Sequence, residues 1–157
     1  MDYVRLLTQI HVAISLLAIL TGLIVVIGLL TARTLDGLSH LFLTSTVATS
    51  VTGFFFPFHG FTPAIGVGII SLIVLAIAIF ARYSKHLQGS WRWIYVVTAM
   101  ISLYLNVFVL VVQSYQKVPA LKALAPTQTE GPFVATQLVT LLLFVVLTIF
   151  SVLRFRV

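Results

Sequence analysis

LTQIHVAISLLAILTGLIVVIGLL, residues 7–30, contains no Asp, Glu, Lys or Arg. A helix needs about 20 apolar residues to cross a hydrocarbon core roughly 30 Å thick, so this stretch predicts a transmembrane helix. Its apolar part is longer than that of a signal peptide, and no small-residue cleavage pattern follows it promptly. We therefore expect the segment to stay attached to the chain.

Four further apolar runs follow, separated by breaks rich in Gly, Pro, Asp and Ser: residues 38–56, 63–82, 93–115 and 133–153. The chain is 61% hydrophobic and only 8% charged, whereas a soluble domain carries about 25% charged residues. Helices satisfy all their backbone hydrogen bonds inside lipid. The sequence therefore predicts an all-α integral membrane protein, with residues 1–157 forming a single bundle of five transmembrane helices.

The basic residues predict the orientation of this bundle. With five spans, the side that holds the C-terminus would carry six of them and the side that holds the N-terminus three: Arg33, Arg82, Lys85, Arg92, Arg154 and Arg156 against Arg5, Lys117 and Lys122. Short cytoplasmic loops carry an excess of Lys and Arg. We therefore expect the N-terminus to be periplasmic and the C-terminus cytoplasmic, with every charged residue at or beyond the end of a span.

The composition disfavours several classes of function. The chain has no cysteine, which excludes disulfides, thiolate metal sites and Cys nucleophiles. Three acids leave little material for acid–base catalysis, and no catalytic or phosphate-binding motif is present, so an enzyme is not favoured. The formal charge of +6 is scattered along the chain, so no nucleic-acid partner is expected.

The four histidines are the candidate metal ligands. His11 and His59 are predicted near the periplasmic side, and His40 and His86 near the cytoplasmic side. Imidazole binds haem iron, copper and zinc. His11 and His59 could therefore hold haem b or copper if the first two helices are neighbours, which would make the chain an electron-transfer protein. The alternative is that all four are interfacial side chains that hydrogen-bond to water or lipid headgroups.

The fourth span carries a polar stripe. Its members recur at helical spacing on one face: Tyr95, Thr98, Ser102, Asn106 and Gln113. A polar side chain at membrane depth normally hydrogen-bonds a neighbouring helix. Packing is one interpretation of the stripe, and the lining of a ligand cavity or of a small transporter or channel is the other.

The stretch TSVTGFFFPFHGFTP, residues 49–63, predicts a tight reversal at the periplasmic interface, with Pro57 and Pro63 on either side of Gly60. Aromatic and polar side chains near this turn form the predicted ligand pocket: His11, Phe56, Phe58, His59, Asn106, Gln113, Tyr115 and Glu130. The loop VPALKALAPTQTEGP lies at the same side, and Pro119 predicts a short surface helix in its first half.

Two stretches carry a resemblance: TSVTGFFFPFHGFTPAIGVGIISL, and WRWIYVVTAMISLYLNVFVLVVQSYQKVPALKALAPTQTEGPF. There the chain resembles a group of small integral membrane proteins of bacteria, mainly proteobacteria, to which no activity is assigned. The resemblance implies a bacterial inner membrane and supplies no site residue. The favoured function is a non-enzymatic accessory or ligand-binding subunit that holds a lipid or quinone-like molecule. Its expected partners are membrane lipids and either further copies of itself or a larger membrane complex.

Overall fold

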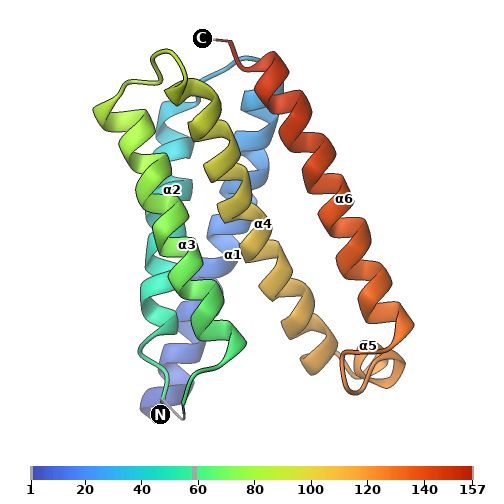
Figure 1. Cartoon of the computed structure of the whole chain (residues 1–157). Helices are drawn as coiled ribbons and strands as arrows, with labels where there is room; N and C mark the ends of the chain where they lie inside the picture. Colours follow the sequence, from blue (N-terminus) through green and yellow to red (C-terminus); the bar gives the residue numbers. More distant parts are fainter. Residues whose placement is uncertain (1, 58–59, 157) are drawn as a thin grey trace.

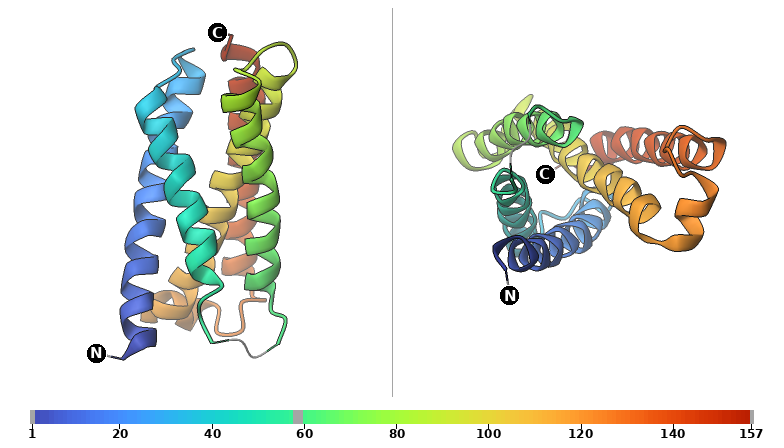
Figure 2. Two further views of the ribbon diagram at one scale, coloured as in Figure 1. Left: turned by 90° about the vertical axis from the view of Figure 1, so that its left-hand side faces the viewer. Right: turned by 90° about the horizontal axis from the view of Figure 1, so that it is seen from below.

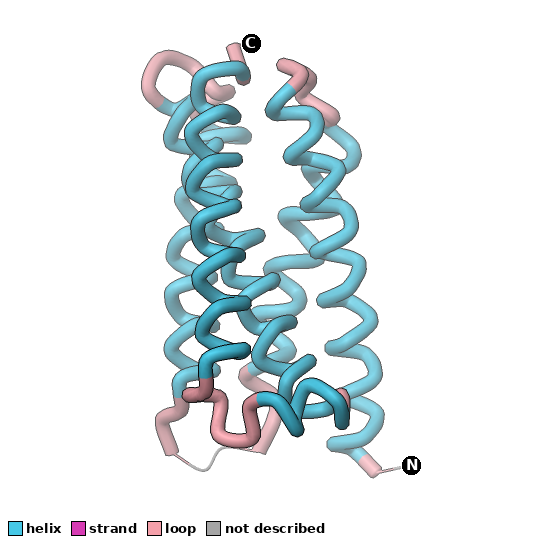
Figure 3. Tube along the Cα trace, turned by 90° about the vertical axis from the view of Figure 1, so that its right-hand side faces the viewer, coloured by secondary structure: helices cyan, strands magenta, loops and turns pink. Residues whose placement is uncertain are grey.

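The computed structural model describes residues 2–57 and 60–156, so Phe58 and His59 of the predicted pocket lie outside the described residues. The described part consists of helices joined by short loops and contains no strand (Figures 1 and 3). The elements are α1 Tyr3–Leu30, α2 Asp36–Gly53, α3 Pro63–Ile79 with a π-helical turn over Phe80–Ser84, α4 Trp91–Lys117, α5 Pro119–Leu124 and α6 Gly131–Arg154. The five long helices coincide with the five apolar runs, and α5 with the predicted surface helix.

Four of these helices are long and apolar enough to cross a membrane: α1, α3 together with its π-helical turn, α4 and α6. Helix α2 is not among them, because Ser and Thr interrupt its apolar residues along most of its 18 positions. The molecule is thus a helical bundle with several apolar helices, as expected of a membrane protein.

The helices begin where the sequence provides caps. The Asp2 carboxylate accepts a hydrogen bond from the Arg5 backbone N–H at 2.8 Å and caps α1. The Thr62 hydroxyl accepts one from the N–H of Ile65 at the start of α3, whose first residue is Pro63. Proline suits this first position because its missing N–H would have no partner inside the helix.

The two termini lie at opposite ends of the bundle (Figure 1). We call the end with the α1–α2 and α3–α4 loops the C-terminal end, and the end with the α2–α3 turn and α5 the N-terminal end. Helices α1 to α4 surround a common axis, whereas α6 lies at the periphery beside α4 (Figure 2).

The hydrophobic core lies almost entirely in the half of the bundle nearest the C-terminal end. Its largest members there are Phe42, Tyr95 and Phe155, each at most 1% exposed. Gly22 permits the close approach of α1, because a Cβ atom at this position would lie 2.6 Å from Leu103 Cδ1 and 2.9 Å from Phe42 Cε1. Toward the N-terminal end, buried side chains become sparse.

Candidate functional site

At the N-terminal end, His11 joins α1 to the end of α2. Its Nδ1 atom lies 2.8 Å from the Thr52 hydroxyl, and its ring meets the edge of the Phe56 ring at a centroid distance of 5.4 Å. The structure thus brings together two members of the predicted pocket, His11 and Phe56. Thr52 completes the group and was not predicted from the sequence.

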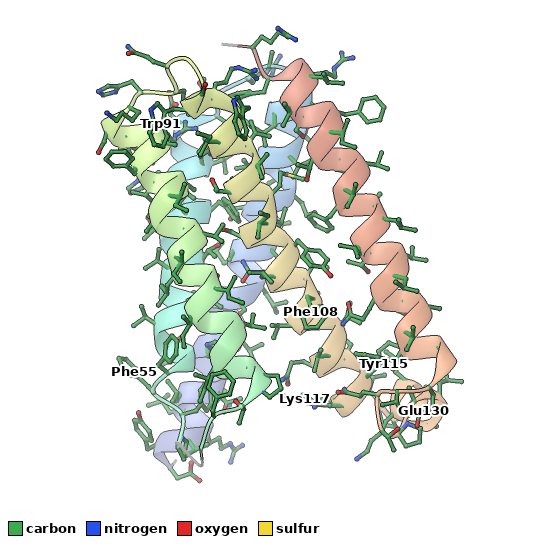
Figure 4. The ribbon with its side chains drawn as sticks, viewed as in Figure 1. Phe55, Trp91, Phe108, Tyr115, Lys117 and Glu130 are labelled. Atoms are coloured by element: carbon green, nitrogen blue, oxygen red, sulfur yellow. The ribbon has the colours of Figure 1, made fainter. Side chains whose placement is uncertain are left out.

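Tyr115 and Glu130 form a separate group beside α5 and α6, away from Phe55 on the α2 side (Figure 4). The Tyr115 hydroxyl lies 2.7 Å from the Thr136 hydroxyl and donates to the Pro132 carbonyl at 3.1 Å. Its ring packs edge-on against Phe133 at a centroid distance of 5.4 Å. These contacts turn Tyr115 toward α6, so its described hydrogen bonds go to that helix and not to His11.

Glu130 precedes α6 and accepts three hydrogen bonds from its own loop. They come from the Thr127 hydroxyl at 2.6 Å, the Thr127 backbone N–H at 3.1 Å and the Thr129 backbone N–H at 3.1 Å. The first of these contributes most to lowering the pKa of the Glu130 carboxyl below its ordinary value, because each donor favours the ionised form. Glu130 therefore holds the loop that leads into α6.

The polar stripe on α4 enters the core at one end and reaches α2 in the middle. Tyr95, Thr98 and Ser102 are buried. Thr98 and Ser102 donate to carbonyls one turn earlier on α4, at 2.7 Å and 2.9 Å. Asn106 Nδ2 donates to the Thr46 hydroxyl on α2 at 3.2 Å, whereas Gln113, farther along, is half-buried. These contacts agree with a packing role for the stripe.

An apolar groove of about 250 Å³ lies between α4 and α6 at the middle of the bundle. One wall carries Met100, Ile101 and Tyr104, and the other carries Leu141, Phe144, Val145, Thr148 and Ile149. The Tyr104 and Phe144 rings meet at a centroid distance of 5.6 Å. The only hydroxyls at this groove are those of Tyr104 and Thr148, and Thr148 donates to the Phe144 carbonyl on its own helix at 2.6 Å.

Polar contacts fasten α6 to the bundle on both sides of this groove. Toward the C-terminal end, Arg92 Nη1 donates to the carbonyls of Val152 at 3.0 Å and Phe155 at 2.5 Å. Toward the N-terminal end, Gln137 Nε2 donates to the Phe108 carbonyl at 3.3 Å, and the Tyr115 hydroxyl bonds to the start of α6. The groove is therefore an apolar gap between two polar attachments.

The sequence did not predict the most deeply buried charge, Arg82. This residue lies in the π-helical turn and is 7% exposed. Its Nη2 atom donates to the Thr34 carbonyl at 3.1 Å and to Asp36 Oδ1 at 2.5 Å, and its guanidinium carbon lies 5.2 Å from the centroid of the Tyr95 ring. A basic residue at the end of an apolar run normally indicates the orientation of the chain in the membrane. The sequence signal for a buried ion pair was therefore Asp36, at the start of α2.

Two donors in this cluster have incomplete hydrogen bonding. Arg82 Nη1 and the Tyr95 hydroxyl are both enclosed, and neither makes a hydrogen bond of full geometry within residues 2–57 and 60–156, although Ser39 and Arg82 lie beside the Tyr95 hydroxyl. The two loops beside them contain Ala32, Leu35, His86 and Leu87, all with φ between 41° and 58°, a left-handed conformation that costs non-glycine residues energy and is enriched at functional sites.

Among the described residues, no group of three or more His, Cys, Asp and Glu side chains could hold a metal ion. The predicted haem or copper pair requires His59, which lies outside them. Comparisons with protein-family models, curated proteins and solved structures give no match. The class that the fold defines is an α-helical bundle of the membrane-protein type.

Proposed function

We propose that the chain is a non-enzymatic accessory or ligand-binding protein of the bacterial inner membrane, and that it holds an apolar chain in the groove between α4 and α6. The groove itself carries this proposal. Its walls are almost wholly aliphatic and aromatic, and the Thr148 hydroxyl is already hydrogen-bonded within its own helix. Such a surface offers a ligand mainly dispersion contacts, which suit a lipid acyl chain or the tail of a quinone.

The attachments of α6 support this assignment. Hydrogen bonds hold α6 to α4 on both sides of the groove. The groove therefore results from the way these two helices pack. The rings of Tyr104 and Phe144, which meet edge-to-face at 63°, offer apolar ring surface against which a chain can pack. This location differs from the turn around His11 and Phe56, where His11 is already hydrogen-bonded to Thr52.

The proposal includes five membrane spans, with α2 as the fifth. The α2 hydroxyls satisfy their own donors inside the helix, which lowers the cost of placing them in lipid. They donate to carbonyls one turn earlier: Ser45 to Leu41 at 2.7 Å, Thr49 to Ser45 at 2.8 Å and Thr52 to Ala48 at 2.8 Å. Helix α2 also packs along α1. Six of the nine Lys and Arg residues lie at the C-terminal end, so this end is proposed to face the cytoplasm.

A pair of neighbouring valines on α6 provides the test. Val145 lines the groove and Val146 does not, yet the two are 46% and 48% exposed. Full-length protein purified in mild detergent would be analysed by native mass spectrometry, with lipid and quinone extraction from the same sample. We expect a retained apolar ligand in wild type and in Val146→Trp, and its loss in Val145→Trp, where the indole fills the groove.

Equal retention in the two variants, or no retained ligand in wild type, would contradict the proposal. An absorbance spectrum of the same sample, oxidised and then reduced with dithionite, together with metal analysis, tests the separate hypothesis of haem b or copper at His11 and His59. A Soret band or stoichiometric copper that is lost in His11→Ala would support that hypothesis.

A further inference from the structure

The buried cluster around Arg82 contains two donors whose hydrogen bonding is incomplete. The guanidinium uses Nη2 for Thr34 and Asp36. Its Nη1 atom and the neighbouring Tyr95 hydroxyl are enclosed and make no hydrogen bond of full geometry in the part of the chain that the structure describes, although Ser39 lies beside the Tyr95 hydroxyl. Leaving a buried donor unpaired costs about 1–3 kcal/mol, and more for a charged group. Two such donors on adjoining side chains indicate that the cluster is made for an additional acceptor.

The charge at this end of the bundle indicates which kind of acceptor. Arg33, Lys85, Arg92, Arg154 and Arg156 lie at the same end as Arg82. Asp36 is the only one of the three acids found there. Six cations against one carboxylate give a positive potential, which attracts anions.

Asp36 is a replaceable partner. The Arg82 side chain is 5% exposed, whereas that of Asp36 is 84% exposed. The carboxylate therefore reaches the guanidinium from the solvent side, at the first position of α2. An external anion that arrives from the same side can take its place without disturbing a packed side chain.

We propose that Arg82 and Tyr95 form a binding site for a phosphate-class anion at the C-terminal end of the bundle, and that Asp36 occupies this site as an internal substitute. The planar guanidinium presents paired N–H donors that match a phosphate group, and a neutral tyrosine hydroxyl donates a further hydrogen bond. The phosphate can belong to the headgroup of an anionic lipid or to a soluble compound. The site is independent of the groove between α4 and α6.

The test measures anion-dependent thermal stability of full-length protein in a neutral detergent. The probes are inorganic phosphate, mixed micelles containing phosphatidylglycerol, and mixed micelles containing zwitterionic phosphatidylcholine as a control. We expect phosphate or phosphatidylglycerol to raise the Tm of wild type. Asp36→Asn removes the negative charge of the internal competitor, although its amide oxygen can still accept, and should tighten the apparent dissociation constant by up to about tenfold, which corresponds to the loss of one competing charge-assisted hydrogen bond.

Tyr95→Phe separates a binding role from a structural one. Because the Tyr95 hydroxyl makes no hydrogen bond of full geometry to the neighbouring Ser39 and Arg82, its removal should leave the fold intact, and a purely structural cluster would keep its anion response unchanged. The proposal expects a weaker response in Tyr95→Phe and none in Arg82→Gln. Arg33→Gln removes an exposed cation at the same end and should respond as wild type does.

The arms of the experiment also identify the source of the phosphate. A response to inorganic phosphate alone assigns a soluble ligand, and a response to phosphatidylglycerol but not to inorganic phosphate assigns a lipid headgroup. If Arg33→Gln lowers the response as much as Tyr95→Phe does, the effect is general electrostatics and the site is refuted. An Asp36→Asn protein that responds no more strongly than wild type would likewise show that Arg82 only anchors the α1–α2 loop.

Discussion

The two halves of this bundle use polar residues in different ways. Near the C-terminal end the helices pack closely, and the polar groups are drawn inward, with Ser39, Arg82 and Ser102 all at most 7% exposed. Near the N-terminal end, several polar side chains remain partly exposed, such as His11 on Thr52 and Glu130 on Thr127, and Ser50 with Ser71 is a buried exception. The core aromatic Phe42 is 1% exposed, whereas Phe61 beside the α2–α3 turn is 74% exposed.

This difference shows in which half of the molecule the positions of polar groups are most strongly constrained. In the packed half, a polar group must find a partner inside the protein or remain unpaired at a cost, so its position is constrained by several helices at once. In the open half, water or lipid headgroups can serve as partners, so each polar contact is nearly independent of the others. Substitutions should therefore act strongly in one half and weakly in the other.

The largest expected effect is a loss of stability through overpacking in the packed half. Gly22→Val would place methyl groups where Leu103 and Phe42 already meet the α1 backbone. The variant should lose about 2–3 kcal/mol of unfolding free energy, measured by chemical unfolding in detergent. Gly131→Val at the N-terminal end is the control, because nothing lies within 4 Å of a Cβ atom there. Similar losses in the two variants would remove the distinction between the halves.

An intermediate effect is expected at the two attachments of α6. Arg92→Met removes the charged donor to Val152 and Phe155 and should cost about 1.5–2 kcal/mol, whereas Tyr115→Phe removes a neutral hydroxyl and should cost about 1 kcal/mol or less. Thermal unfolding of both variants in the same detergent would rank them. A larger loss in Tyr115→Phe would show that the N-terminal attachment is the stronger one.

The smallest effect is expected at Glu130, whose hydrogen bonds to its own loop are exposed to solvent. Hydrogen bonds from Thr127 and Thr129 lower the pKa of this carboxyl in the folded protein. The stability they contribute is present above the ordinary carboxyl pKa and is lost as the pH falls through the lowered value.

The chain contains one glutamate, so selective ¹³C labelling gives a single carboxyl signal whose titration reports this pKa directly. Thr127→Val should return the pKa toward its ordinary value, because the largest cause of the shift is removed. An unchanged titration in that variant would mean that the loop is not held by these hydrogen bonds.

The helices themselves could be predicted from the sequence. Apolar runs, Pro63 and Pro119 at helix starts and glycine-containing breaks give the bounds of the five long helices and of α5 to within a few residues. These features are local, since they depend on backbone propensity and on burial of one segment at a time. Whether all five long helices cross a membrane is a property of the surroundings and stays a prediction.

The arrangement of the sites could not be predicted in the same way. Arg82 is buried because two separate parts of the chain meet around it: the α1–α2 connection with Thr34 and Asp36, and α4 with Tyr95. The Tyr115 hydroxyl bonds to Pro132 and Thr136 on α6, across a connection that contains α5. Both outcomes depend on the order and tilt of the helices, which apolar periodicity does not encode. The composition of α6 likewise does not predict that this helix lies at the periphery of the bundle.

The unequal lengths of the helices relate the protein to the thickness of the bilayer. Helices α1 and α4 contain 28 and 27 residues, or about 40 Å each, while α3 with its π-helical turn contains 22, or about 33 Å. A hydrocarbon core of about 30 Å matches α3, but α1 and α4 must tilt or project beyond it. A thicker membrane would bring these two helices upright, and because α4 forms one wall of the groove, membrane thickness would then also set the width of the groove.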